Sequence, residues 1–119
     1  MKHLIYISFL LLVFSSCKKE EKKYSVTYKI IEISNNTPTY IVRYTLNNGA
    51  TQSLGNITAN SWTSGTLSDY KAGSVLNLEV EGSGGGTYEM YILVNGTNDG
   101  YRIADDSNGA QSLEVVLPN

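Results

Sequence analysis

The chain has 119 residues and a formal net charge of −2, enough for one domain with a modest hydrophobic core. Its only histidine is His3 and its only cysteine is Cys17. Residues 24–119 therefore contain no imidazole or thiol, which excludes Ser-His-Asp and Cys-His catalysis there and zinc sites built from His or Cys. The same residues carry four basic and nine acidic side chains, a net charge of −5, and lack the basic surface that nucleic-acid backbones require. We therefore expect a domain that is not an enzyme, holds no cofactor and binds no nucleic acid.

Residues 1–16 have the pattern of a signal peptide. A short basic start, Met1-Lys2-His3, precedes an apolar run from Leu4 to Phe14 that only Ser8 interrupts. A helical run of this length spans roughly 16 Å, whereas the hydrocarbon core of a bilayer is about 30 Å thick. The run is too short for a good transmembrane helix, and its flanks fit a secretory signal.

The small residues Ser15 and Ser16 stand immediately before Cys17. This arrangement resembles the lipobox of bacterial lipoproteins, with Phe14 at a position where leucine is commoner. The resemblance implies that the thiol of Cys17 is acylated, that Cys17 becomes the first mature residue, and that the lipid anchors the chain in the outer membrane. The alternative is a plain secretory signal with an incidental cysteine, although a lone cysteine in an exported protein has no disulfide partner.

Residues 17–23 join this cysteine to the domain. The stretch from Lys18 to Lys23 has four lysines, two glutamates and no apolar residue, so we expect a disordered tether that reaches roughly 20 Å when extended. Within it, Lys19-Glu20-Glu21 resembles the surface-export signal of lipoproteins from Bacteroidota. The sequence leaves open whether the domain is displayed at the cell surface or at the periplasmic face of the outer membrane.

The first half of the domain predicts β-strands because apolar residues alternate with polar ones. The first strand is expected at Tyr24–Ile33, with a bulge at Ile30-Ile31 where the alternation slips. A second strand at Thr39–Leu46 ends in Asn47-Asn48-Gly49, a hairpin signal, and Ala50–Ile57 is a weaker third strand.

The second half continues this pattern. Strands are expected at residues 66–70, 75–81, 88–94, 101–104 and 112–117, and Asn95-Gly96 predicts a tight hairpin turn. The strand at 88–94 is expected to be central and partly covered on both faces. Short strands with turns every eight to twelve residues predict an all-β, immunoglobulin-like antiparallel β-sandwich of about seven strands at residues 24–119.

Several segments resemble MmpS-like domains. Val26-Thr27-Tyr28 and residues 42–49 are similar to their opening hairpin, Trp62 with residues 70–76 to their middle, and residues 91–96 to their late strand and its turn. The resemblance implies a small β-sandwich outside the inner membrane that acts as an accessory subunit of an MmpL-type lipid exporter. The chain departs from that family by carrying a predicted lipid anchor where its members carry a transmembrane helix.

Aromatic residues are the first candidate binding residues, because their faces stack on sugars and anchor protein interfaces. Tyr40 and Tyr44 lie on one predicted strand face, four residues apart in the sequence, and Trp62 is the single tryptophan. If that face is exposed, these three residues form a ligand platform. The alternative is that the tyrosines are strand residues with buried rings.

Two weaker patterns involve carboxylates. Asn95, Asp99 and Asp106 loosely match a calcium loop, although Asn95-Gly96 is already explained as a turn. Glu79, Glu81 and Glu89 lie on strands predicted to be adjacent, so two of these carboxylates could form a glycosidase pair. The alternative is that they are ordinary charges on a solvated sheet face.

Two functions remain open. In the first, the chain is a membrane-anchored, non-catalytic accessory module that binds an envelope protein or transporter. In the second, it binds a carbohydrate or another surface ligand through exposed Tyr or Trp. An apolar edge strand or flat patch would favour the first, and an exposed aromatic row in a shallow groove the second.

Overall fold

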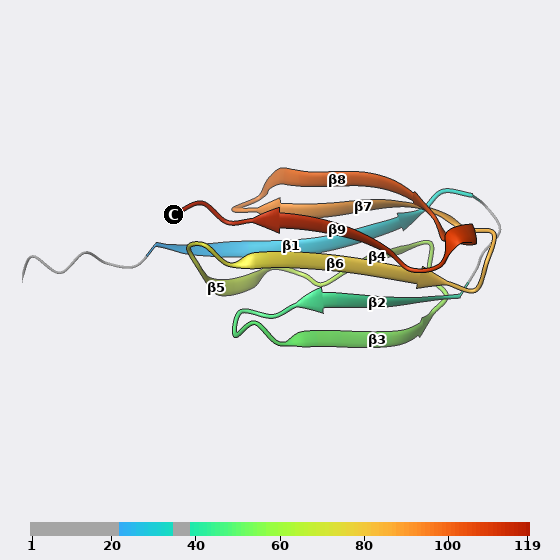
Figure 1. Ribbon diagram of the computed structural model, residues 1–119, viewed down its shortest axis with the longest axis horizontal. Helices are drawn as coiled ribbons and strands as arrows, with labels where there is room; N and C mark the ends of the chain where they lie inside the picture. Colours follow the sequence, from blue (N-terminus) through green and yellow to red (C-terminus); the bar gives the residue numbers. More distant parts are fainter. Residues whose placement is uncertain (1–21, 35–38) are drawn as a thin grey trace, which may run out of the picture.

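The computed structural model describes residues 22–34 and 39–119, which form strands and one 3₁₀ helix (Figure 1). The elements are β1 (Lys23–Glu32), β2 (Tyr40–Thr45), β3 (Thr51–Ile57), β4 (Ser61–Thr63), β5 (Leu67–Lys71), β6 (Val75–Gly82), β7 (Thr87–Val94), β8 (Thr97–Asp105), η1 (Asp106–Asn108) and β9 (Gln111–Val116). Over these residues no helix is long and apolar enough to cross a membrane. The predicted signal peptide and Cys17 lie outside the described residues.

Two antiparallel sheets pack as a sandwich, which confirms the predicted all-β class (Figure 1). The first sheet has the order β4-β1-β7-β8, and β5 extends it beside β4 along the same edge of β1. The second sheet has the order β3-β2-β6-β9. The described residues form nine strands rather than about seven: each of the eight predicted segments contains a strand, and β4 around Trp62 was not expected.

The core is made by the inward-facing residues of both sheets. Strand β7 alternates strictly between half-buried and buried residues, with Tyr88, Met90 and Ile92 fully buried. Facing them from β6 are Leu76, Leu78 and Val80, which are also fully buried. The alternation in the sequence therefore predicts the buried faces of both central strands correctly.

Strand β1 differs from the prediction. Its buried positions stay in one phase through Val26, Tyr28, Ile30 and Glu32, and its pairing with β7 runs without interruption. The predicted bulge at Ile30-Ile31 is therefore wrong. The apparent slip arises because Glu32, a charged residue, occupies the next buried position, where its carboxylate accepts hydrogen bonds from the backbone N–H and hydroxyl of Ser34.

The two predicted hairpin turns are confirmed. Gly49 adopts a φ of +86° in the β2–β3 turn, and Asn95 and Gly96 both have positive φ in the β7–β8 turn, which tight hairpins demand. Strand β8 begins directly after that turn and is longer than the predicted 101–104 segment.

The chain enters the sandwich at one end, which we call the entry end. It comprises Lys22 and Lys23 with the β2–β3, β5–β6 and β7–β8 turns, all at the left of Figure 1. Lys23 pairs with Lys71 of β5, and the backbone N–H of Ala72 donates to Lys22 O. Lys23, the last residue of the predicted tether, therefore belongs to β1, and Lys22 is bonded to the β5–β6 turn, so these two residues are ordered. Helix η1 and the β6–β7 loop lie at the opposite end (Figure 1).

Candidate interaction surface

Tyr40 does not meet the condition for a ligand platform. Its side chain is 1% exposed, its ring packs edge-on against Tyr88 and its hydroxyl donates to Ala59 O. It is a core residue with a satisfied hydroxyl, which is the alternative weighed from the sequence.

Tyr44 and Trp62 do come together, although they belong to different sheets. Their ring centroids are 5.3 Å apart, and Tyr44 also contacts Tyr28 at 5.2 Å. Both residues are half-buried and pack against the core. The cluster bridges β2 and β4 and helps to close the interior between the two sheets.

The three residues considered for calcium do not come together. Asn95 lies in the β7–β8 turn, where its side-chain oxygen accepts from the backbone N–H of Ser25. Asp106 lies in η1, at the other end of β8. A strand of this length spans roughly 30 Å, so Asn95, Asp99 and Asp106 cannot share an ion. Among the described residues, no three His, Cys, Asp or Glu side chains gather closely enough to hold a metal.

The three glutamates weighed for glycoside hydrolysis are separated. Strands β6 and β7 belong to different sheets rather than lying side by side. Glu79 and Glu81 of β6 flank Arg43 at 2.6 and 2.9 Å, on the outer face of the second sheet. Glu89 of β7 accepts a hydrogen bond from the Tyr91 hydroxyl on the outer face of the first sheet. Glu89 therefore cannot pair with the other two.

The outer faces of the two sheets differ in chemistry. The centre of the second sheet's outer face is occupied by the Arg43–Glu79–Glu81 ion network. The outer face of the first sheet instead presents a row of apolar and aromatic side chains, which we call the β1–β7–β8 face. Its members are Ile31, Tyr91, Leu93, Tyr101 and Ile103, with Lys29 and Glu89 among them.

The exposed part of this face lies on β8. Tyr101 is 49% exposed and Ile103 is 56% exposed, whereas Tyr91 beneath them is half-buried. Tyr101 stands directly opposite Tyr91 in the ladder, and their ring centroids are 5.0 Å apart. Strand β8 ends the order of its sheet, so the aromatic pair lies beside a strand edge.

Neighbouring charges hold Tyr91 in place. The Lys29 ammonium lies 5.8 Å from the centroid of the Tyr91 ring, within range of a cation–π contact. The hydrogen bond to the Glu89 carboxylate is the largest of the effects that raise the pKa of Tyr91 to about 12, and partial desolvation is the next largest. The Tyr91 ring is therefore held in one position with its hydroxyl un-ionised, and the Tyr101 ring packs against it.

A bulge in β8 turns these side chains outward. Ile92 pairs with Gly100 but Leu93 pairs with Asn98, so Asp99 is an extra residue in β8. Without this extra residue, Ile92 would pair with Asp99, and Tyr101 and Ile103 would face the core. The bulge also places Gly100 inward, where an added Cβ would lie 2.6 Å from Val115 Cγ2.

The side chain of Arg102 covers part of the free edge of β9, next to this face. The Arg102 guanidinium donates to Ser112 O and to the side-chain oxygen of Gln111, at 2.6 Å each. These bonds cover part of the free edge of β9 with a charged side chain, a common protection against edge-to-edge pairing. The apolar surface beside β8 has no equivalent cover among the described residues.

Comparison with known proteins adds no identification. No protein-family model matches the chain, and no curated protein matches it.

Proposed function

We propose that the chain is a lipoprotein of the bacterial outer membrane, anchored through Cys17, whose β-sandwich is a non-catalytic module that binds an envelope protein. The binding surface is the β1–β7–β8 face. An accessory role beside a transporter is what the resemblance to MmpS-like domains implies.

One observation carries this proposal, the contrast between the two outer faces. Large exposed apolar side chains beside a strand edge, such as Tyr101 and Ile103, are typical of protein interfaces. The centre of the opposite outer face carries an ion network, and the exposed apolar residues there, Val75 and Val116, are one aliphatic pair without an aromatic ring. An apolar and aromatic surface with Lys29 and Glu89 as polar neighbours is typical of a protein interface.

The anchor is tested by Cys17→Ala. Removing the acylated thiol is expected to release the protein from membranes, because acyl chains supply the stable attachment. Membranes are washed at high salt and pelleted, and the protein is detected in both fractions. Continued pelleting of the Cys17→Ala protein would contradict the anchor. Protease treatment of intact cells would then place the domain at the cell surface or at the periplasmic face.

The binding face is tested by Tyr101→Asp combined with Ile103→Asp. A charge at the centre of an apolar interface should lower partner capture at least about tenfold. Both positions are exposed, so thermal unfolding should change little. Ser53→Asp, at an exposed position on the opposite sheet, is the matched control. Equal loss of capture in the control would contradict the assignment of this face.

A carbohydrate ligand is the second candidate, and the Tyr91–Tyr101 ring pair favours it. An exposed tyrosine over a fixed second ring offers a stacking surface to a sugar. Binding on a glycan array that Tyr101→Ala abolishes, together with no captured protein partner, would favour this function over the first.

A further inference from the structure

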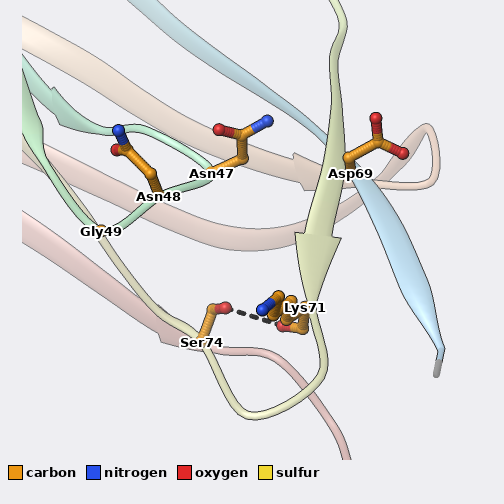
Figure 2. A pocket seen from close by; sticks show the side chains of 6 residues that line it. All are labelled: Asn47, Asn48, Gly49, Asp69, Lys71 and Ser74. Carbon is orange, nitrogen blue, oxygen red and sulfur yellow. Dashed lines mark hydrogen bonds between the residues drawn. The ribbon is translucent and has the colours of Figure 1, made fainter.

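A polar cleft lies at the entry end of the sandwich (Figure 2). It has a volume of about 580 Å³ and is lined by Asn47, Asn48, Gly49, Asp69, Lys71 and Ser74. These residues come from the β2–β3 turn on one side and from β5 and the β5–β6 turn on the other. The cleft is separate from the β1–β7–β8 face.

Lys71 is the cation of this cleft. All ion pairs among the described residues involve Arg43, so the Lys71 ammonium has no carboxylate partner there. Its side chain lies beside Ser74, whose hydroxyl donates to Lys71 O at 2.7 Å (Figure 2). The Asn48 side-chain oxygen accepts from the backbone N–H of Ala50, which leaves the amide NH₂ group available to a ligand.

Two acidic residues lie at the same end. Asp69 has a φ of +68° at the irregular part of the β1–β5 pairing. Its carboxylate points away from Asn47 and Asn48 in Figure 2. Asp99 lies in the β8 bulge. The same end carries three lysines, Lys22, Lys23 and Lys71, so its basic side chains outnumber these two carboxylates. Lys23 pairs directly with Lys71 between β1 and β5. The donors around the cleft therefore suit an anion.

The proposed anchor brings this end to a lipid surface. Four residues, Lys18 to Glu21, lie between Cys17 and Lys22, and the five Cα-to-Cα steps that join the two ends reach at most about 18 Å when extended. Because the chain enters beside Ala72, the turns of the entry end are the part of the domain nearest the acylated cysteine. The anionic group most abundant at that distance is the phosphate of membrane lipids.

We propose that the entry end is a membrane-contact surface, in which the cleft receives the phosphate of an anionic phospholipid against Lys71 and Lys22 and Lys23 lie beside it. This inference rests on the proposed anchor at Cys17. This contact would orient the sandwich with its strands roughly perpendicular to the membrane. The β1–β7–β8 face would then remain accessible to a protein partner.

The test uses the intact lipoprotein in vesicles of phosphatidylcholine, with or without phosphatidylglycerol. A nitroxide is attached at Thr97→Cys near the entry end or at Ser107→Cys in η1, since an acylated Cys17 leaves the new thiol as the only free one. Nickel chelated to lipid headgroups should increase the spin-relaxation rate of the nitroxide at position 97, and not of the one at position 107, when phosphatidylglycerol is present. Lys71→Met should lower the end-on population about fivefold, and Lys71→Arg should preserve it.

Equal relaxation of the two labels, or no effect of Lys71→Met, would overturn the proposal while flotation with phosphatidylcholine vesicles still supported the anchor. Failure to float with those vesicles would remove the anchor and this inference together. A response to free glycerol phosphate without any response to phosphatidylglycerol vesicles would also overturn it. None of these results depends on the partner that binds the β1–β7–β8 face.

Discussion

Raising the pH above about 10, the ordinary pKa of tyrosine, is expected to unfold the domain cooperatively. Burial raises the pKa of Tyr28, Tyr40, Tyr70 and Tyr88 above that value. All four side chains are at most 1% exposed. In the folded chain these hydroxyls therefore stay protonated at a pH where the unfolded chain releases their protons.

The direction follows from proton linkage. Above pH 10 the folded state binds more protons than the unfolded state, so the free energy of unfolding falls as the pH rises. The loss is up to about 1.4 kcal/mol per pH unit for each tyrosine that stays protonated when folded. Tyr28 and Tyr88, the two with large shifts, together lose up to about 3 kcal/mol by about pH 11, and Tyr40 and Tyr70 add to this loss. The total stability of a typical domain is about 5–15 kcal/mol.

The measurement is a series of urea transitions from pH 8 upward, with tyrosinate absorbance followed in parallel. Tyr28→Phe is the control, because it removes one titrating group and should make the decline in stability shallower. That variant also loses the hydrogen bond from the Tyr28 hydroxyl to Thr45 O, so its stability at pH 8 is the reference. Full ionisation of all tyrosines with an intact circular dichroism spectrum would contradict this account.

Asp106→Ala is expected to cause the largest loss of stability among single substitutions at polar residues. The Asp106 carboxylate is buried and accepts from the backbone N–H groups of Gly84 and Gly86 and from the Tyr88 hydroxyl, at 3.3, 2.7 and 3.1 Å. It thereby ties the β6–β7 loop and β7 to η1. Removing it leaves up to three donors without their partner, which costs about 3 kcal/mol or more.

A loss of this size should lower the melting temperature by about 12 °C or more for a domain of this length. Asp106→Asn keeps the shape and part of the acceptor capacity, so its loss should be intermediate. Asp99→Ala, at an exposed position in β8, is the matched control and should change the melting temperature little. Equal melting temperatures for the Asp106 and Asp99 variants would show that this carboxylate is not a structural anchor.

The strands and turns could be predicted because their signals are local. Asn95-Gly96 fixes a tight turn through its own backbone preferences, and the alternation from Tyr88 to Val94 fixes which side of β7 is buried. The same rule failed at Glu32, because a buried carboxylate satisfied by Ser34 cannot be told from a surface charge by its type.

The exposed surface could not be predicted, because it depends on register. Alternation from the Asn95-Gly96 turn places Tyr101 inward, and only the extra residue Asp99 reverses it. The prediction that Tyr40 could bind a ligand was wrong because Tyr40 is buried. From the sequence alone, an aromatic strand residue fits a core and a binding face equally well. If the extra residue at Asp99 had been anticipated, the register of β7 and β8 would have predicted that Tyr91 and Tyr101 face each other.

The most direct test of the proposed function is site-specific photo-crosslinking of the lipoprotein in native membranes. A photoreactive residue replaces Tyr101 on the β1–β7–β8 face or Ser53 on the opposite sheet, and adducts are identified by mass spectrometry. We expect one reproducible envelope-protein adduct from position 101 and none from position 53. The same adduct at both positions, or none at position 101, would contradict the claim that this face binds a protein partner.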